Sequence, residues 1–377
     1  MSNKILINGI NNSSAGGKTV LLNFIKGFSK YSNSFGVIII APKLIENEIQ
    51  KCINDSNIEL VFVKKPNALK SLYWYLYGIP KIIIKRNINL VLNFGDIPIK
   101  TKFCKQIFYF DWPHAIYPES AAWKRFSIVT LISKKIKLLV FKFLFNYIDH
   151  VIAQTNTAVN RLKVYYPKSH YTVLNNPVSR FSVAEETVNV SFNKSNFYLF
   201  FLTRYYEHKN LESIIPLAET IKKNCDNIKI LITVEKNHGH GARKLLQNIE
   251  LNRLNEIIIN VGEISLGQVT FLYKKIDALF MPTLLESFSG TYIESMYFEK
   301  PILTSDIDFA KEICGNGAIY FNPFNTQEQF DAIKFIRENS KEKSQLIKNQ
   351  KHQLHNFINW ESKTKKIVEL INKILIE

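Results

Sequence analysis

The chain of 377 residues is 46% hydrophobic and 21% charged, a balance that excludes a disordered or fibrous protein. Its length allows two domains that each bury a core of their own. The 49 Lys and Arg residues outnumber the 32 Asp and Glu residues and give a formal net charge of +17, so we expect an anionic partner: nucleic acid, anionic lipid or a phosphorylated substrate.

The start of the chain and its cysteines indicate a cellular compartment. The four cysteines are scattered without the paired spacing of a metal site, so we expect reduced, structural thiols. The first four residues lead directly into a strand-like run, and no apolar segment is long enough for a signal peptide or a membrane span. These features predict a protein that stays in the cytoplasm.

Short apolar runs that are typical of buried strands alternate with helical periodicity through the first half of the chain. Helices are expected over 19–31 and around 69–86. The strand-like runs are 5–9, 35–41, 58–64, 88–94, 105–110 and 149–155. This alternation predicts a parallel sheet with helices on both faces.

A glycine-containing loop, Ser-Ser-Ala-Gly-Gly-Lys, follows the first of these strands and places Gly16 and Gly17 at a helix start. Such a loop suits a phosphate or a close approach of the backbone to a substrate. The spacing is neither that of a P-loop nor a complete Gly-x-Gly-x-x-Gly, so the loop alone is weak evidence.

Asp111 and His114 come just after the strand at 105–110. A histidine at a ligand cleft suits the orientation of a sugar hydroxyl or the activation of an acceptor, whereas a lone histidine is more often structural. The pattern does not choose between Asp111 and His114 as the residue of this loop that acts in a site.

The segment 123–149 is basic and apolar, and it contains no acidic residue between Lys124 and Tyr147. As one helix it suits a membrane interface, in which its lysines contact anionic headgroups at up to ~1 kcal/mol each. It suits equally a core helix whose lysines extend from an exposed edge. Its charges interrupt it too often for a membrane span.

A second series of alternating runs predicts a second domain of the same kind. The domain boundary is expected near 170–183, where Asn175, Asn176 and Pro177 break the periodicity, so that the domains are 1–178 and 179–359. A final amphipathic helix is expected over 360–377. The strand-like runs are 196–204, 227–235, 255–262, 277–283, 301–305 and 318–323.

Arg204 and Lys209 follow the first strand of this second series. Ligands bind at the carboxyl ends of parallel strands, which is where these two cations are expected. They suit the neutralisation of a diphosphate leaving group. An Arg and a Lys on the surface near a turn would give the same sequence pattern.

Two carboxylates, Glu286 and Glu294, stand on either side of a predicted helix start. Eight positions along one helix would rotate them about 80° out of register, so Glu286 is assigned to the preceding loop and Glu294 to the first turns of the helix. Between them, Ser289, Gly290 and Thr291 provide small residues and possible caps. The free amides of a helix N-terminus suit a phosphate, and the carboxylates suit hydroxyl groups on either side of it, which together describe a nucleotide sugar.

Asp306-Ile307-Asp308 fits the Asp-x-Asp pattern that binds a divalent metal and a donor diphosphate in another class of glycosyltransferase. Short patterns of this kind often occur by chance. We assign it to structure on the donor side and predict no obligatory metal.

The block from Glu286 to Glu294 resembles the donor-binding segment of the retaining GT-B glycosyltransferases, specifically glycosyltransferase family 4, whose pattern is Glu, seven residues, Glu. The family usually reads Glu-Gly-Phe-Gly, whereas this chain reads Glu-Ser-Phe-Ser, with Gly290 one place later. The run 207–211 looks like the family's cation segment, with Thr203 where a glycine is usual. The resemblance is strong over 277–323, moderate over 204–211 and weak in the first domain.

This resemblance implies a GT-B fold, in which two Rossmann-like domains face an interdomain cleft and the last helix, 360–377, crosses back to the first, acceptor-binding domain. It implies that Glu286 holds sugar hydroxyls, that Glu294 holds the ribose, and that Arg204 and Lys209 stabilise the departing diphosphate. The amides around Ser289, Gly290 and Thr291 would add donors, and the loop of Gly16 and Gly17 would lie beneath the donor. Family members carry a His or a variant in the loop of His114.

The expected function is that of a retaining, metal-independent, hexosyltransferase-type enzyme that needs no cofactor besides its nucleotide diphosphate sugar donor. Its acceptor would be a glycan or a lipid-linked glycan in bacterial surface polysaccharide synthesis, at the anionic inner face of the cytoplasmic membrane. The alternatives are a GT-B-fold epimerase of nucleotide sugars and a non-catalytic basic protein that binds nucleic acid. The intact donor motif disfavours a nucleic-acid partner.

Overall fold

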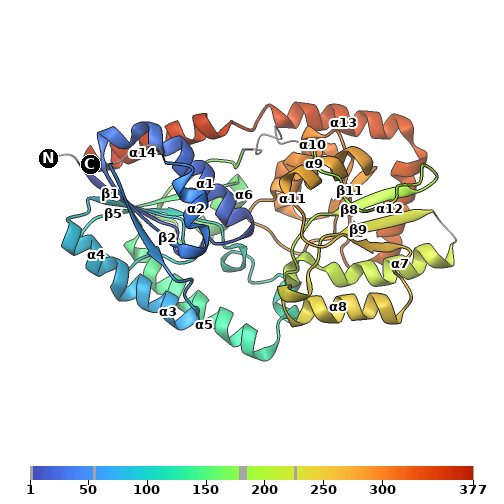
Figure 1. The fold of residues 1–377 in the computed structure, drawn as a ribbon, viewed down its shortest axis with the longest axis horizontal. Helices are drawn as coiled ribbons and strands as arrows, with labels where there is room; N and C mark the ends of the chain where they lie inside the picture. The colour runs from blue at the N-terminus through green and yellow to red at the C-terminus, as the bar shows by residue number, and fades with distance from the viewer. Residues whose placement is uncertain (1–2, 54–56, 178–184, 225–226, 377) are drawn as a thin grey trace. The chain divides into compact units, whose positions relative to one another are not determined.

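The computed structural model describes residues 3–53, 57–177, 185–224 and 227–376, which form two compact α/β units (Figure 1). The first unit consists of residues 1–117, 127–177 and 358–377, and the second of residues 118–126 and 178–357. The predicted boundary at 178/179 lies outside the described residues. Within these residues no helix has the length and apolar character needed to cross a membrane.

The first unit contains a parallel sheet in the order β3-β2-β1-β4-β5-β6-β7, which has seven strands in the described residues. Its strands are short, apolar and mostly buried, as expected of a parallel sheet with both faces covered. They are β1 Lys4–Asn8, β2 Gly36–Pro42, β3 Ile58–Val63, β4 Leu90–Asn93, β5 Lys105–Tyr109, β6 His150–Ala153 and β7 His170–Val173.

Helices alternate with these strands, and α1 and α14 bury apolar side chains in one core with β1, β2 and β4. A π-helical turn, Trp74–Gly78, joins α3 to α4. The helices are α1 Ala15–Phe28, α2 Glu46–Gln50, α3 Ala68–Tyr73, α4 Ile79–Arg86, α5 Ile128–Leu144, α6 Asn156–Tyr165 and α14 Trp360–Ile376.

The C-terminal helix α14 packs on α1 in the first unit, as predicted for residues 360–377. Gly27 allows the helices to approach closely, because a Cβ at this position would lie 2.6 Å from Thr364 Oγ1. Beside it, the buried Lys363 donates hydrogen bonds to the Tyr109 hydroxyl at 2.9 Å, the Leu174 carbonyl at 3.0 Å and the Asn176 side chain at 2.6 Å. One buried lysine side chain thus attaches the helix to the ends of β5 and β7.

The second unit contains a parallel sheet in the order β10-β9-β8-β11-β12-β13, with six strands in the part that the structure describes. These strands match the six runs that the sequence predicts. They are β8 Phe197–Phe201, β9 Ile228–Ile232, β10 Ile258–Asn260, β11 Ala278–Met281, β12 Ile302–Ser305 and β13 Ala318–Phe321.

Helices again alternate with the strands of this unit. Ser265 begins α9 with a capping box, in which its hydroxyl accepts from the Gln268 amide and the Gln268 side chain accepts from the Ser265 amide. The helices are α7 Ile214–Lys223, α8 His240–Leu251, α9 Leu266–Lys275, α10 Gly290–Tyr297, α11 Asp308–Cys314, α12 Thr326–Glu338 and α13 Ser340–Leu354.

The structure corrects three details of the sequence analysis. Strand β7 lies where only a break in periodicity was expected, because its four residues are too few to show alternation. The segment 123–149 is not one helix, since Phe126 is extended and the Ser127 hydroxyl caps a new helix, α5, by accepting from the Thr130 amide. Residues 118–126, assigned above to the first domain, belong to the second unit.

Candidate functional site

The candidate site lies where β8 and β11 neighbour each other in the second unit. From β8 the chain continues to β9 on one side, and from β11 it continues to β12 on the other. A crevice forms at the carboxyl ends of two parallel strands at such a point, and ligands bind there. Arg204 and Lys209 follow β8, and Glu286 follows β11, so the topology brings three predicted residues to one edge of the sheet.

Lys209 and Glu286 form an ion pair between the two loops. Their side chains are only 13% and 10% exposed. Burial raises the pKa of Glu286, and the Lys209 ammonium opposes that rise. The pair therefore holds two charged side chains, both of which can hydrogen-bond, at the carboxyl ends of β8 and β11.

Backbone contacts hold the same two loops together. The Leu284 amide donates to the His208 carbonyl at 2.8 Å. Asn210, which adopts a left-handed backbone with φ of 59°, donates from its amide group to the carbonyls of Pro282 at 3.1 Å and Pro323 at 3.0 Å. The position of the Lys209–Glu286 pair is thus fixed by contacts that do not involve its charges.

Helix α10 begins at Gly290, and Ser289 occupies its N-cap position without bonding the helix backbone. The Ser289 hydroxyl instead lies 2.8 Å from the Thr291 hydroxyl, which donates to the Met281 sulfur at 2.9 Å. A Cβ on Gly290 would meet no atom within 4 Å. The space beside Gly290 is therefore open at the start of α10, and a helix N-terminus suits an anionic ligand.

Glu294 lies in α10, as predicted, one turn beyond Gly290. The Tyr273 hydroxyl lies 3.3 Å from its carboxylate and 3.2 Å from the Thr291 carbonyl. Burial raises the pKa of Glu294 to about 7, and the hydrogen bond from Tyr273 opposes the rise. Tyr273 was not predicted; it lies in α9, and nothing in its local sequence distinguishes it from a core aromatic residue.

Arg204 is half-buried just after β8. The charge of Arg204 affects the pKa of two neighbouring side chains, Tyr206 and His238. Burial raises the pKa of Tyr206 and Arg204 opposes that rise, while burial and then Arg204 lower the pKa of His238. Arg204 therefore lies at the same end of the sheet as the loop that contains Lys209.

The segment 118–126 packs on these loops. The Ser120 hydroxyl donates to the Leu284 carbonyl at 3.3 Å, and the Arg125 guanidinium donates to the Asn210 side chain at 2.6 Å. Arg125 thus supports the residue that joins the two loops. Sequence reasoning missed this role, since the partners of Arg125 lie 85 residues away in the chain.

The remaining predicted site residues lie in the first unit, which we describe by itself. Gly16 and Gly17 are in the first turn of α1, and a Cβ on Gly16 would meet no atom within 4 Å. A Cβ on Gly17 would lie 3.1 Å from the Asn12 side chain. The loop is therefore compatible with a close approach of a ligand at Gly16.

Asp111 and His114 differ in their electrostatics. Burial and then Asp96 raise the pKa of Asp111 to about 8. Burial and then Lys134 and Lys137 lower the pKa of His114 to about 3, so the buried imidazole is neutral at ordinary pH. A neutral ring can orient a hydroxyl group but cannot act as a cation.

Both aspartates of the Asp-x-Asp pattern bond to other groups of the protein itself. Asp306 pairs with Lys311 at 2.5 Å, and the Asp308 carboxylate accepts from the Phe309 amide at 2.8 Å at the start of α11. In the described ranges there is no group of three or more His, Cys, Asp or Glu residues that could hold a metal ion.

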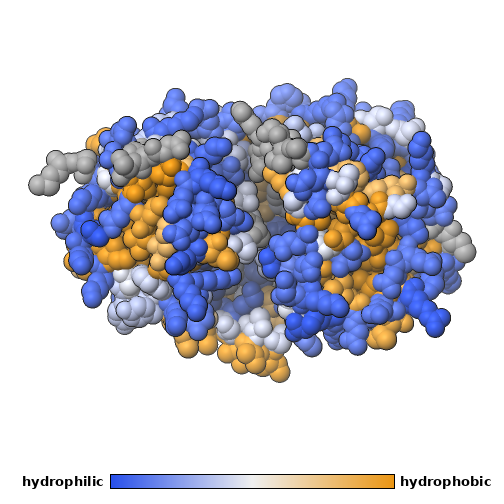
Figure 2. Space-filling view, viewed as in Figure 1, coloured by the Kyte–Doolittle hydropathy of each residue, from blue (hydrophilic) through white to orange (hydrophobic). Residues whose placement is uncertain are grey.

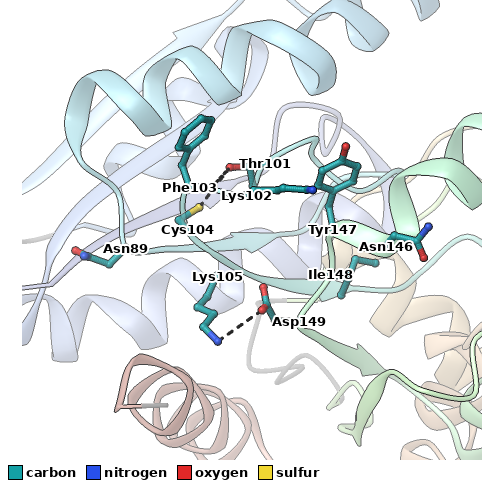
Figure 3. Close-up of a pocket in the computed structure, with 10 residues that line it drawn as sticks. All are labelled: Asn89, Thr101, Lys102, Phe103, Cys104, Lys105, Asn146, Tyr147, Ile148 and Asp149. Atoms are coloured by element: carbon teal, nitrogen blue, oxygen red, sulfur yellow. Dashed lines mark hydrogen bonds and ion pairs between the residues drawn. The ribbon is translucent and has the colours of Figure 1, made fainter.

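A cavity of about 470 Å³ lies elsewhere, in the first unit. Asn89, Lys105 and Asp149 mark the amino ends of β4, β5 and β6 there, and Lys105 and Asp149 are 3.7 Å apart (Figure 3). Because ligands of parallel sheets bind at the carboxyl ends of the strands, we do not assign this cavity to the candidate site.

The second unit matches a family of known proteins. Residues 183–353 match the family model described as "Glycosyl transferases group 1". A stretch of 179 residues, 45% of this chain, is 28% identical to the O-antigen chain mannosyltransferase RfbU of Salmonella typhimurium (strain LT2) and covers 49% of that protein. The match therefore spans about half the length of this curated relative.

Solved structures resemble the whole chain. They include sucrose-phosphate synthase (tll1590) from Thermosynechococcus elongatus, with a TM-score of 0.74, 13% identity and 100% coverage of both chains. Anabaena Alr3699/HepE in complex with UDP and glucose gives a TM-score of 0.69 at 13% identity and covers 98% of this chain and 100% of its own. The pneumococcal O-GlcNAc transferase GtfA in complex with UDP and GlcNAc gives 0.68 at 11% identity, with 100% coverage of both. The chain has the GT-B fold, and the matches to its second unit support a GT-B glycosyltransferase.

Proposed function

We propose that the protein transfers a sugar from a nucleotide diphosphate sugar to a glycan or lipid-linked acceptor. The observation that carries this proposal is that the Lys209–Glu286 pair and the start of α10, with free space at Gly290, both follow the carboxyl ends of β8 and β11. Cations and free amides suit a diphosphate, and carboxylates suit hydroxyl groups. The UDP complexes of HepE and GtfA support a nucleotide donor.

In the proposed mechanism, Glu286 accepts hydrogen bonds from hydroxyl groups of the donor sugar, and Glu294 accepts them from the ribose. Arg204, Lys209 and the amides of Ser289, Gly290 and Thr291 stabilise the departing diphosphate. The reaction retains the anomeric configuration, because the leaving phosphate deprotonates an acceptor that attacks from the same face. We also assign roles in substrate binding to His114, or Asp111, and to the loop of Gly16 and Gly17.

The proposed reaction needs no metal ion or other cofactor. Its diphosphate is neutralised by side chains and amides, and the aspartates of the Asp-x-Asp pattern are engaged at α11. We expect EDTA to leave sugar transfer unchanged. Complete loss of activity in EDTA that added Mg²⁺ or Mn²⁺ restores would contradict this part of the proposal.

The pathway we propose is the synthesis of a bacterial surface polysaccharide at the inner face of the cytoplasmic membrane. Its support is the similarity to an O-antigen mannosyltransferase over 45% of the chain and the net charge of +17. A lipid-linked glycan would present its sugar at such an anionic surface.

The test is thermal stabilisation and donor hydrolysis across UDP-, GDP-, ADP- and dTDP-sugars. We expect one nucleotide series to stabilise the parent, and Arg204→Ala and Glu294→Ala each to lose ten- to hundred-fold in turnover or affinity, since a hydrogen bond to a charged group contributes ~1.5 to 3 kcal/mol. The exposed-site controls Arg243→Ala and Glu250→Ala should behave like the parent.

Two outcomes would contradict sugar transfer. No response to any sugar nucleotide would remove the donor site. Conversion of the sugar nucleotide without an acceptor, into an isomer that product analysis identifies, would indicate an epimerase.

A further inference from the structure

Helix α5 is held in the first unit by one of its faces. Phe141 and Leu144 are fully buried there. The Phe141 ring lies 5.9 Å from Phe108 and 5.8 Å from Trp112, measured between centroids. This aromatic contact fixes the rotation of α5 about its own axis and therefore decides which residues point away from the sheet.

The opposite face of α5 is apolar and exposed, which is unusual for a helix on the surface of a globular unit. At 100° per residue, its six large apolar side chains fall within an arc of about 100°. We call them the α5 stripe: Ile128, Val129, Ile132, Ile136, Leu139 and Phe143, which are between 54% and 79% exposed. Figure 2 shows apolar atoms along the lower edge of the first unit, where Figure 1 places this helix.

The charges that α5 itself carries are all of one sign. Exposed Lys135 and Lys142 follow one edge of the stripe, and no Asp or Glu occurs between Glu119 and Asp149. A stripe of this kind is poorly suited to a second copy of the chain, because pairing two stripes would bring lysines of both copies together. An apolar stripe with lysines along its edge is complementary to an anionic lipid surface.

We propose that the α5 stripe docks the protein on an anionic membrane, with α5 lying parallel to the surface. The six apolar side chains would enter the boundary between headgroups and acyl chains, while Lys135 and Lys142 contact lipid phosphates. The helix has 17 residues and is about 25 Å long, enough for several lipids in a row. Docking rests on this surface alone and would place the proposed transferase beside a lipid-linked acceptor.

The experiment is sedimentation with vesicles of phosphatidylcholine containing 30% phosphatidylglycerol, compared with phosphatidylcholine alone, without any sugar nucleotide. We expect the parent to bind the anionic vesicles and to be released by high salt. Ile132→Glu/Ile136→Glu should abolish binding, whereas Leu251→Glu, at a side chain 70% exposed in the second unit, should not.

The lysines provide a second, independent arm. Each contact with an anionic surface is worth about five-fold in partitioning, so Lys135→Gln/Lys142→Gln should weaken binding about 25-fold. Lys223→Gln/Lys341→Gln, which changes the net charge equally at exposed positions of the second unit, should cost much less.

A fluorescence arm tests insertion without disrupting the stripe. Val129→Trp should shift its emission to shorter wavelength with anionic vesicles, and Leu251→Trp should not. No binding by the parent, equal binding by stripe and control variants, or a dimer in solution that Ile136→Glu converts to a monomer would overturn the proposal. Donor stabilisation is measured without vesicles, so failure here and failure of the proposed function are distinguishable.

Discussion

Two side chains, Lys209 and Glu286, set the electrostatics of the candidate site. Both are nearly buried, so each charge compensates the other where water cannot. The sequence predicted both residues as parts of a site, but it predicted different ligands for them and not an ion pair. In the structure the two side chains bond to each other.

We predict that Lys209→Met lowers the free energy of unfolding by about 2 to 3 kcal/mol at pH 8, because it leaves Glu286 charged and buried. The loss should shrink at pH 5. Without Lys209 the raised pKa of Glu286 rises further. A carboxyl group whose pKa is raised in the folded protein contributes stability at low pH, and this stability is lost as the pH increases.

Urea unfolding of parent and variant at both pH values measures the effect. Adding Glu286→Gln to Lys209→Met should restore most of the stability at pH 8. A loss that is the same at pH 5 and pH 8 would show that packing, rather than charge, connects the two residues.

We predict that the charge of Glu294 lowers the stability of the folded protein but strengthens its binding of the nucleotide. Its pKa of about 7 in the folded protein exceeds the usual 4.5, so the group contributes stability below pH 4.5 that is lost as the pH rises through 7. Glu294→Gln should therefore stabilise the protein at pH 8 by on the order of 1 to 2 kcal/mol and have little effect at pH 4.5.

The same variant should bind the nucleotide at least ten-fold more weakly, because an amide accepts hydrogen bonds from ribose hydroxyls less strongly than a carboxylate does. Thermal unfolding with and without nucleotide measures both effects. A variant that is less stable than the parent at pH 8 would contradict the electrostatic account of Glu294.

At the scale of elements, the segment 118–126 contacts and supports the two loops of the site. Arg125 donates to Asn210 at 2.6 Å and lies 3.6 Å from Glu212, whose other oxygen accepts from the Tyr205 hydroxyl. A single guanidinium thus contacts the loop after β8 and the turn that precedes α7. Its effect on the site is through position and not through contact with a donor.

We predict that Arg125→Ala weakens donor binding about five-fold while leaving the pH dependence of turnover unchanged, because it loosens the loop of Lys209 without altering its charge. Arg125→Lys should recover only part of the loss, since an ammonium cannot reproduce the fork of a guanidinium. Isothermal titration with the nucleotide checks this. Unchanged affinity in Arg125→Ala would show that the loops hold without this support.

Helix α14 depends on the buried Lys363 for its position. Burial lowers the pKa of Lys363 well below its usual value, so the group contributes stability at high pH that is lost as the pH falls through its folded-state pKa. We predict that Lys363→Met is less stable than the parent by about 1 to 3 kcal/mol at pH 9 and that this gap narrows at pH 6. Urea unfolding measures it, with exposed Lys366→Met as the control. A gap that widens at pH 6 would contradict this account.

At the scale of the whole molecule, the chain builds two units that each contain a parallel sheet and a core. The predicted donor residues lie in the second unit, and helix α14 belongs to the first. We predict that a matched nucleotide at 100 times its Kd stabilises the second unit by about 2.7 kcal/mol and so raises its unfolding temperature, while the unfolding temperature of the first unit stays largely unchanged.

Calorimetry of the parent and two variants assigns the transitions. Lys209→Met should lower one transition and Lys363→Met the other. A single transition that both variants and the nucleotide shift together would show that the units unfold as one.

Local sequence determined the strand runs and the place of each predicted site residue along the chain. Twelve of the thirteen strands in the described residues correspond to predicted runs, because buried parallel strands are short and continuously apolar. Glu286 in a loop and Glu294 in a helix followed from helical spacing alone. The resemblance to GT-B enzymes then gave the fold, which the comparisons confirm.

Tertiary structure alone decided the contacts between residues far apart in the chain. Arg125 and Ser120 belong to the second unit because they contact Asn210 and Leu284. These partners lie 85 and 164 residues away in the chain, and no periodicity carries information over such a distance. Helix α5 is apolar on two sides, so its sequence could not indicate which side faces the sheet. The packing of Phe141 decided that, and it left the α5 stripe exposed.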